Sequence, residues 1–251
     1  MLIALIQCDI LWERSADNLS RLDALFAKTP HAELYLLPEM FNTGFVTSAA
    51  EAAEPAGGPA FQWMLSRSKY LGSVIAGSVA VVEDGKYFNR MYFVRPDGTW
   101  DQYDKRHLFA KEAQDYTPGR DRVIAQWKGY RFLLATCYDL RFPVWLRNRG
   151  DYDMILLGAS WPASRRYAWD TLLKARAIEN QCFVAGVNRV GDDPNASYNG
   201  GSVLVNPLGE VLSECPDSEQ CSVTSFAELE LVGDYRKRFP ALQDADKFEL
   251  L

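Results

Sequence analysis

The feature of this sequence that most constrains its fold is a short apolar strand that runs directly into a helical turn at Cys137. Residues 132–135 are consecutive apolar residues, with the length and composition of a buried strand. Asp139 follows where an acidic residue of a first helical turn belongs, and the apolar spacing beyond it predicts a helix at 143–149. Cys137 is therefore expected at a strand-to-helix turn, with its sulfur near a helix N-terminus.

This position suits a nucleophile. Unpaired backbone N–H groups and the positive end of the helix dipole favour a thiolate at a helix N-terminus. The same N–H groups can hold an oxyanion that develops during acyl transfer. A lone cysteine at the end of a core strand is more often a small apolar residue. The catalytic interpretation of Cys137 therefore depends on partners elsewhere in the chain.

The charge balance limits the classes of partner. The 251-residue chain has a formal net charge of −6 and a pI of about 5.1, and it has no long basic run. We therefore expect no nucleic-acid partner and no binding to an anionic membrane. The longest apolar run, residues 74–82, is too short to span a bilayer as a helix. A local group of arginines can still bind a small anion.

The five cysteines, at positions 8, 137, 182, 215 and 221, have no metal-ligand spacing such as C-x-x-C. Their odd number and their placement in apolar strands predict reduced thiols in a cytoplasmic protein. Residues 1–9 lack a basic start and a cleavage site, so they are expected to form a first strand and not a signal peptide. The sequence predicts neither a metal site nor a cofactor.

Apolar runs and helical spacing alternate along the chain in the order strand–helix–strand, which is typical of an α/β fold. Turn residues at 84–85 and 96–98 add antiparallel hairpins. The predicted elements include strands at 2–8, 34–37, 132–136, 154–157, 182–188 and 223–231, helices at 13–28, 143–149 and 164–181, and a glycine-rich loop at 191–201.

No linker or low-complexity segment divides the chain, so residues 1–251 are predicted to form a single domain. Residues 234–251 are predicted to be a charged C-terminal tail with apolar residues interspersed. This tail is expected either to pack on the domain or to reach a partner subunit.

Three ionisable residues resemble Cys137 in lying at a strand end or in a loop. Glu39 follows the strand at 34–37, Lys105 lies near the end of a short extended segment at 101–106, and Glu112 lies in an irregular stretch before Gly119. A cysteine nucleophile needs a base to take its proton and an acid to protonate the leaving group. A lysine ammonium can hold the oxyanion. Isolated charges are mostly exposed and inert, so the argument depends on the complete set.

The local sequences around these residues resemble three signature motifs of the nitrilase, or carbon–nitrogen hydrolase, superfamily. The matching stretches are Leu-Leu-Pro-Glu-Met-Phe at 36–41, Tyr-Asp-Lys-Arg-His-Leu-Phe at 103–109 and Cys-Tyr-Asp-Leu-Arg-Phe-Pro at 137–143. Residues 176–180 and 186–189 are also similar to that family. The resemblance extends over nearly the whole chain, and the joint match is far more specific than any one motif.

The resemblance implies a four-layer αββα sandwich with two mixed β-sheets, and a homodimer paired through its outer helices. It implies that Cys137 is the nucleophile, Glu39 the general base and Lys105 the transition-state stabiliser. Glu112 matches the second glutamate of the family, although the alignment in this short loop is looser.

Three stretches resemble a branch of the superfamily more closely: Cys-Tyr-Asp-Leu-Arg-Phe at 137–142, Ser-Trp-Pro at 160–162 and Arg-Phe-Pro-Ala-Leu at 238–242. By these stretches the sequence is most similar to the bacterial omega-amidase branch. Members of that branch release ammonia from the terminal amide of small 2-oxo acid monoamides such as 2-oxoglutaramate and 2-oxosuccinamate. Nearby branches, acting on deaminated glutathione or N-carbamoyl compounds, remain alternatives.

A 2-oxo acid substrate brings a carboxylate, which an arginine fork can bind. Arg141 is the first candidate for this contact, with Arg165 and Arg166 as further candidates, and Tyr138 and Trp161 are expected to wall the pocket. Each of these residues has a purely structural alternative, either an ion pair or core packing.

Four other interpretations compete with a cysteine amidase. A Cys–His hydrolase would use His107, but no Asn or Asp spacing singles out this histidine. A thiol redox protein would need a resolving cysteine. A glycosidase would use Glu39 and Glu112 without the cysteine. A non-enzymatic binding module would lack a catalytic residue, and none is missing here.

Overall fold

The centre of the fold consists of two mixed β-sheets packed face to face. This computed structural model describes residues 1–249 of the chain. The first sheet has the order β15-β1-β2-β4-β5-β6, with β3 added beside β4, and the second has the order β14-β13-β10-β9-β8-β7. The first sheet contains β1 (Leu2–Gln7), β2 (Leu34–Leu36), β3 (Glu54–Pro55), β4 (Val74–Glu83), β5 (Lys86–Val94), β6 (Trp100–Asp104) and β15 (Cys221–Phe226).

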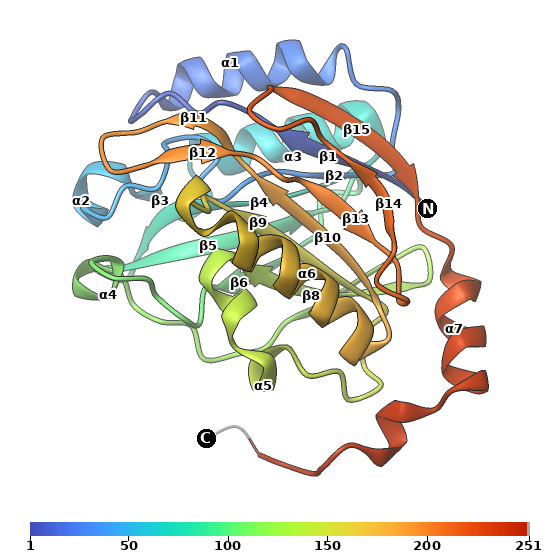
Figure 1. Cartoon of the computed structure of the whole chain (residues 1–251). Helices are drawn as coiled ribbons and strands as arrows, with labels where there is room; N and C mark the ends of the chain where they lie inside the picture. The colour runs from blue at the N-terminus through green and yellow to red at the C-terminus, as the bar shows by residue number, and fades with distance from the viewer. Residues whose placement is uncertain (250–251) are drawn as a thin grey trace.

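The second sheet contains β7 (Ile124–Trp127), β8 (Tyr130–Thr136), β9 (Met154–Ala159), β10 (Phe183–Asn188), β13 (Val203–Val205) and β14 (Val211–Glu214). Helices α1 (Ser15–Phe26) and α3 (Pro59–Leu71) pack on the outer face of the first sheet. Helix α6 (Arg166–Asn180) packs on the outer face of the second sheet. These layers, visible in Figure 1, confirm the predicted αββα arrangement of an α/β fold.

The period-two alternation of side chains in each strand explains this layering. Ile3 and Leu5 of β1 belong to the core between the two sheets. Ala4 and Ile6 of the same strand belong to the core beneath α1 and α3. Because both faces of β1 are covered, the strand is continuously apolar in sequence.

Several elements differ from their sequence prediction. The helix predicted at 143–149 is only α5 (Pro143–Leu146), because Arg147 has extended backbone and its guanidinium donates to the Glu179 carbonyl oxygen instead. The glycine-rich loop predicted at 191–201 contains a small hairpin of β11 (Val190–Asp192) and β12 (Ser197–Asn199). Short helices α2 (Ala49–Ala52), α4 (Glu112–Asp115), η1 (Cys137–Arg141) and η2 (Ala163–Arg165) lie in the connections.

The C-terminal region also differs. The predicted strand at 223–231 ends at Phe226, and helix α7 (Leu229–Arg238) follows, so the start of the predicted tail at 234–251 is helical. The Arg236 side chain anchors α7 by donating to the Tyr152 and Gln181 carbonyl oxygens. A short helix, η3 (Ala241–Asp244), comes next, and residues 250–251 lie outside the described residues.

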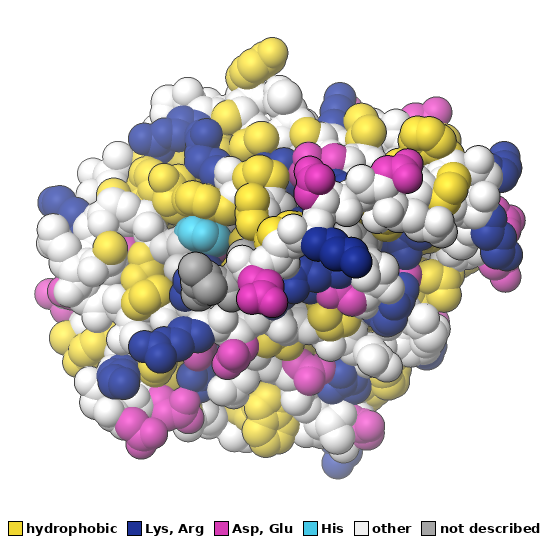
Figure 2. Space-filling view, turned by 90° about the horizontal axis from the view of Figure 1, so that it is seen from below, with side chains coloured by type: hydrophobic (Ala, Val, Ile, Leu, Met, Phe, Trp, Pro, Cys, Tyr) yellow, Lys and Arg dark blue, Asp and Glu magenta, His cyan; other side chains and the backbone are white. Residues whose placement is uncertain are grey.

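The surface mixes chemical types. On the face in Figure 2, basic, acidic and hydrophobic side chains are interspersed. Within residues 1–249, no helix combines the length and the apolar character that crossing a membrane requires.

One close approach between the sheets positions the segment that contains Glu39. A Cβ atom on Gly158, in β9, would lie 2.5 Å from the Leu37 carbonyl oxygen and 3.3 Å from the Glu39 nitrogen. Only a residue without a side chain allows the end of β2 to lie so near β9. Gly158 therefore sets the position of Glu39 relative to the second sheet.

We predict that Gly158→Ala pushes the Glu39 backbone away from β9, because the new methyl group meets backbone atoms that cannot rotate aside. The variant should lose about 1–3 kcal/mol of unfolding free energy and at least tenfold in activity per folded molecule, since small displacements of catalytic groups are costly. Thermal unfolding measures the first effect, and turnover of the small amides that the sequence resemblance predicts as substrates measures the second.

Gly186→Ala is the matched control. This glycine lies in the adjacent strand β10, and the three atoms nearest its new Cβ all belong to the side chains of Leu173 and Trp169 and not to the backbone. It should lower stability while leaving activity per folded molecule unchanged. Full activity in folded Gly158→Ala would contradict the positioning role of Gly158.

Candidate active site

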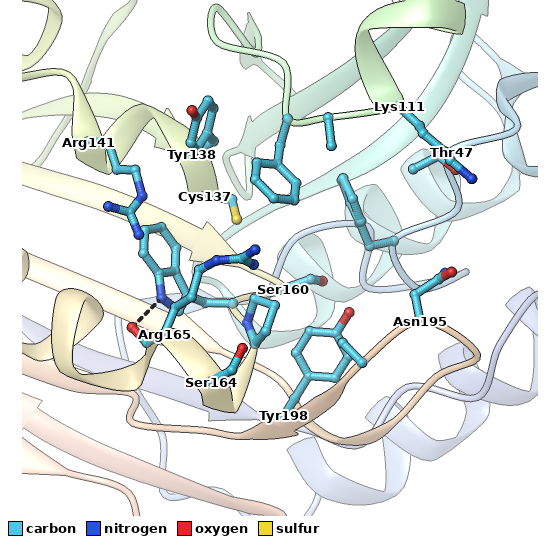
Figure 3. A pocket seen from close by; sticks show the side chains of 16 residues that line it. Thr47, Lys111, Cys137, Tyr138, Arg141, Ser160, Ser164, Arg165, Asn195 and Tyr198 are labelled. Atoms are coloured by element: carbon cyan, nitrogen blue, oxygen red, sulfur yellow. Dashed lines mark hydrogen bonds between the residues drawn. The ribbon is translucent and has the colours of Figure 1, made fainter.

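Cys137 lies on a sharp turn between β8 and the short helix η1, as the sequence predicts. Its φ angle is +45°, in the left-handed region that costs a non-glycine residue about 1–3 kcal/mol. Asp139 supports the turn because its carboxylate accepts a hydrogen bond from the Thr136 N–H at 3.0 Å. The Cys137 side chain is directed into a cavity (Figure 3) and is nearly buried.

The Asp139 carboxylate also ties this turn to the segment that contains Lys105. It accepts hydrogen bonds from the Tyr103 hydroxyl at 2.7 Å and from the His107 backbone N–H at 3.0 Å. His107 Nδ1 lies 2.8 Å from the same carboxylate. The imidazole also stacks on Phe142, with ring centroids 3.7 Å apart. His107 is therefore bound within a structural network, which weighs against the Cys–His alternative.

Three of the ionisable residues singled out in the sequence form one buried cluster beside Cys137. Lys105 Nζ lies 2.8 Å from Glu39 Oε1 and 2.8 Å from Glu112 Oε2. All three side chains are fully buried. Glu112 is the first residue of the short helix α4 and not a loop residue. The structure therefore brings together all four residues that the sequence proposed as catalytic.

Backbone donors fix both carboxylates. Glu39 Oε2 accepts the Ser160 N–H at 3.0 Å, and Glu112 Oε2 accepts the Phe109 N–H at 2.8 Å. Charge-assisted hydrogen bonds of this kind are short and strong. Each carboxylate is thus held from two sides, which limits its rotation.

Asn89 completes the cluster, and the sequence analysis missed it. Its Nδ2 donates to Glu39 Oε1 at 2.8 Å and to Glu112 Oε1 at 2.9 Å. The signal that could have revealed it is a short uncharged polar residue in the aromatic-rich run of β5, because buried polar side chains in a core strand need partners.

The electrostatics of the cluster follow from its burial and its charge count. Burial lowers the pKa of Lys105, but the Glu112 and Glu39 carboxylates outweigh it and hold that pKa above its usual value. Burial raises the pKa of Glu112, which the Lys105 ammonium partly opposes. One ammonium between two carboxylates leaves an excess of negative charge next to the thiol.

The expectation of a thiolate favoured by the helix N-terminus is wrong for this resting state. Burial, followed by the nearby Glu39 carboxylate, raises the pKa of Cys137 well above its usual value. Desolvation and a neighbouring negative charge both disfavour the thiolate, and η1 is only five residues long. The sulfur is therefore a neutral thiol that needs a base at the moment of reaction.

The cavity around Cys137 has a volume of about 390 Å³ and a cationic lining. Tyr138 and Trp161 form part of its wall, as predicted. Arg141, Arg165 and Lys111 also line it, and its lining within the described chain includes no Asp or Glu. In Figure 3, Arg141 and Arg165 lie on the left of the view, away from Lys111 on the right.

The three candidate arginines differ in their contacts: two lie near aromatic rings of the cavity, and the third is paired with carboxylates outside it. The Arg141 guanidinium lies 5.0 Å from the Trp161 ring centroid, and that of Arg165 lies 5.2 Å from the Phe109 ring. Arg166, the third candidate from the sequence, lies outside this cavity and forms ion pairs with Asp170 and Asp217. Arg141 and Arg165 are therefore placed to meet an anion, whereas Arg166 is not.

Known proteins with similar sequences span the whole chain. The carbon–nitrogen hydrolase family model matches residues 2–237. The omega-amidase YafV of Yersinia enterocolitica is 44% identical over 99% of this chain and 98% of its own length, and that of Escherichia coli is 43% identical over the same shares. A 2-oxoglutaramate amidase of Bacillus subtilis is 32% identical over 98% of this chain and 97% of its own.

Among solved structures, XC1258 of Xanthomonas campestris, described as a CN-hydrolase superfamily protein with an arsenic adduct in its active site, superposes with a TM-score of 0.96. It is 41% identical, and the match covers 100% of this chain and 98% of that one. Taken together with the site geometry and the family match over residues 2–237, these findings place the protein: the chain belongs to the carbon–nitrogen hydrolase family.

Proposed function

We propose that this protein is an omega-amidase that hydrolyses the terminal amide of small 2-oxo dicarboxylic acid monoamides, such as 2-oxoglutaramate and 2-oxosuccinamate, and releases ammonia. The observation that carries the proposal is the buried Glu39–Lys105–Glu112 cluster beside Cys137, at a cavity whose charged lining residues are all cationic. The relatives named omega-amidase and 2-oxoglutaramate amidase support the same substrate class.

The first half-reaction forms a thioester. Glu39 takes the proton of the neutral Cys137 thiol, and the sulfur attacks the amide carbonyl carbon. The Lys105 ammonium and the backbone N–H of Tyr138 hold the oxyanion of the tetrahedral intermediate. Glu39 then returns the proton to the departing nitrogen, so the C–N bond breaks and ammonia leaves.

The second half-reaction hydrolyses the thioester. Glu39 takes a proton from a water molecule, whose oxygen attacks the acyl carbon. As the C–S bond breaks, Glu39 gives that proton to the departing sulfur, which releases the acid and restores both the thiol and the Glu39 carboxylate. Glu112 holds Lys105 through the 2.8 Å ion pair.

The cavity lining gives the preference for an anionic substrate. Arg141 and Arg165 can bind the carboxylate at the far end of a 2-oxo acid amide. Tyr138 and Trp161 pack against its short carbon chain. Amides of deaminated glutathione and N-carbamoyl compounds also carry carboxylates, so they remain the alternative substrates within the same chemistry.

We also propose a homodimer in the cytoplasm, as predicted from the resemblance and the cysteine usage. Tyr167 and Ile178 of α6 are large apolar residues that are exposed on this chain, and they provide apolar surface for a second copy.

Replacing the nucleophile tests the reaction directly. Cys137→Ala should keep the fold, because the change removes one sulfur atom at the cavity wall, and should abolish ammonia release from every amide. Ammonia assays on a panel that includes 2-oxoglutaramate, with mass spectrometry of the intact protein, should show an acyl adduct on wild type and none on the variant. Turnover by Cys137→Ala would rule out the thioester route.

Comparing Glu39 with His107 separates the two candidate bases. Glu39→Gln should lower kcat by about 100-fold or more, because general base catalysis contributes 10²–10⁴-fold. His107→Asn should retain most of its kcat, because the histidine is bonded to Asp139 and not to the thiol. Steady-state kinetics of both variants measure this, and the reverse order of effects would favour the Cys–His alternative.

The arginines should control substrate preference. Arg141→Gln and Arg165→Gln should each lower kcat/KM for 2-oxoglutaramate by about 10-fold or more relative to a neutral amide of similar length, since a hydrogen bond to a charged group is worth about 1.5–3 kcal/mol. Arg166→Gln is the control, because its guanidinium is paired outside the cavity. An unchanged preference in both cavity variants would argue against a carboxylate site there.

A further inference from the structure

We propose that Asn89 is a positioning residue that holds Glu39, Glu112 and Lys105 in one fixed arrangement and keeps both carboxylates available in ionised form. This inference rests on the proposed function only in its assignment of these three residues to amide hydrolysis.

The contacts of Asn89 reach all three partners of the nucleophile. Its Nδ2 bridges Glu39 Oε1 and Glu112 Oε1, and its backbone carbonyl oxygen accepts the Lys105 N–H at 2.9 Å. The residue is 1% exposed. These three groups come from the end of β2, from α4 and from the end of β6, so Asn89 is a contact point common to three separate segments.

The strand that carries Asn89 is itself firmly held. β5 pairs along its whole length with β4, and its residues 90–94 pair with β6, both in antiparallel register. The next residue, Arg90, forms ion pairs with Asp104 and Glu83. Successive side chains alternate between strand faces, so these ion pairs hold the register that turns Asn89 toward the carboxylates.

The chemistry of the site favours an amide over other side chains at this position. A primary amide offers two N–H donors with no charge, so it can bond both carboxylates without neutralising either. A lysine or arginine would cancel the negative charge that lets Glu39 act as a base. An aspartate would add a third acceptor, and a hydroxyl has only one hydrogen to donate.

The two hydrogen bonds that Asn89 Nδ2 donates determine the orientation of the side-chain amide, as the environment of its carbonyl oxygen indicates. This oxygen is buried and has no hydrogen-bond partner among the described residues, a state that costs about 1–3 kcal/mol. Turning the amide over would place the oxygen against two carboxylates. The side chain therefore keeps the orientation that serves Glu39 and Glu112.

Several charged and titratable groups surround the carboxylates of Glu39 and Glu112. Lys105 lies between the carboxylates, Cys137 faces Glu39, and the Tyr116 hydroxyl, at the end of α4, has its pKa raised by burial and by both carboxylates. Hydrogen bonds to a carboxylate favour its charged form. Removing the Asn89 donors should therefore make the pair easier to protonate.

Asn89→Leu, which has similar volume but no donors, is the first test. We expect kcat to fall by about 100-fold while KM changes less than threefold, since Asn89 does not line the cavity. The acid limb of the kcat/KM profile should move to higher pH, because a base that protonates more easily is inactive over a wider acidic range. The pH profiles of all variants are measured with the amide that the wild-type protein hydrolyses most efficiently.

Asn89→Asp is the second test, and it should shift the pH profile in the opposite direction. An aspartic acid can donate one hydrogen bond only while protonated, so this variant should be most active at low pH. Its activity should decline as pH rises, which moves the alkaline limb to lower pH than in wild type. A purely structural role would not move the two limbs in opposite directions.

Asn148→Leu is the matched control. Asn148 is a buried asparagine far from the cluster, bonded to Asn180 and to the Tyr152 carbonyl oxygen. Its variant should lower the melting temperature and leave both pH limbs in place. Wild-type limbs in both Asn89 variants would overturn the proposal. So would failure of both Asn89 variants to fold where Asn148→Leu folds, because Asn89 would then serve the fold alone.

These outcomes are distinct from failure of the proposed function. If the wild-type protein prefers an amide other than a 2-oxo acid amide, the proposed substrate class is wrong. The pH limbs of the Asn89 variants should still move in the directions given above. Turnover by Cys137→Ala would remove the thioester mechanism whatever the Asn89 variants do.

Discussion

The site depends on one buried ammonium shared by two buried carboxylates. Removing such charges from water costs several kcal/mol per ion, and only close pairing with further hydrogen bonds repays it. Lys105 lies 2.8 Å from both Glu39 and Glu112, and the backbone N–H groups of Ser160 and Phe109 donate to Glu39 Oε2 and Glu112 Oε2. The arrangement leaves one excess negative charge next to a neutral thiol. In the proposed mechanism, a proton moves from this thiol to the Glu39 carboxylate once substrate enters.

The two-sheet architecture brings these groups together. Glu39 follows β2 of the first sheet, whereas Cys137 follows β8 of the second. The two residues can meet only because the sheets pack face to face and because Gly158 lets β9 approach the end of β2. The Asp139 carboxylate adds a second connection between the sheets, from the Cys137 turn to Tyr103 and His107. The same contacts that stabilise the core thus align the nucleophile with its base.

The sequence predicted the parts of this structure that depend on local pattern. The continuous apolar run of β1 and the strand-to-helix turn at Cys137 could be predicted because each is encoded within a few residues. The neutral thiol was not, because the pKa of Cys137 depends on burial and on Glu39, almost a hundred residues away in the chain. Asn89 was missed for a related reason, since its partners lie on other elements. The helix predicted at 143–149 stopped early where Arg147 and Asn148 bond to the end of α6.

Chemistry and selectivity occupy different parts of the site. In the proposed mechanism the buried cluster acts on the amide group, and the cavity holds the rest of the substrate. Preference must therefore come from the cavity, where Arg141 and Arg165 are carried by η1 and η2, outside the central sheets. Loop-borne residues can change without disturbing buried strands, whereas a change in the cluster would leave a buried charge unpaired. A fold arranged in this way can keep one amide-cleaving reaction while its substrates diverge. In this chain the cationic lining of the cavity favours an amide whose other end is anionic.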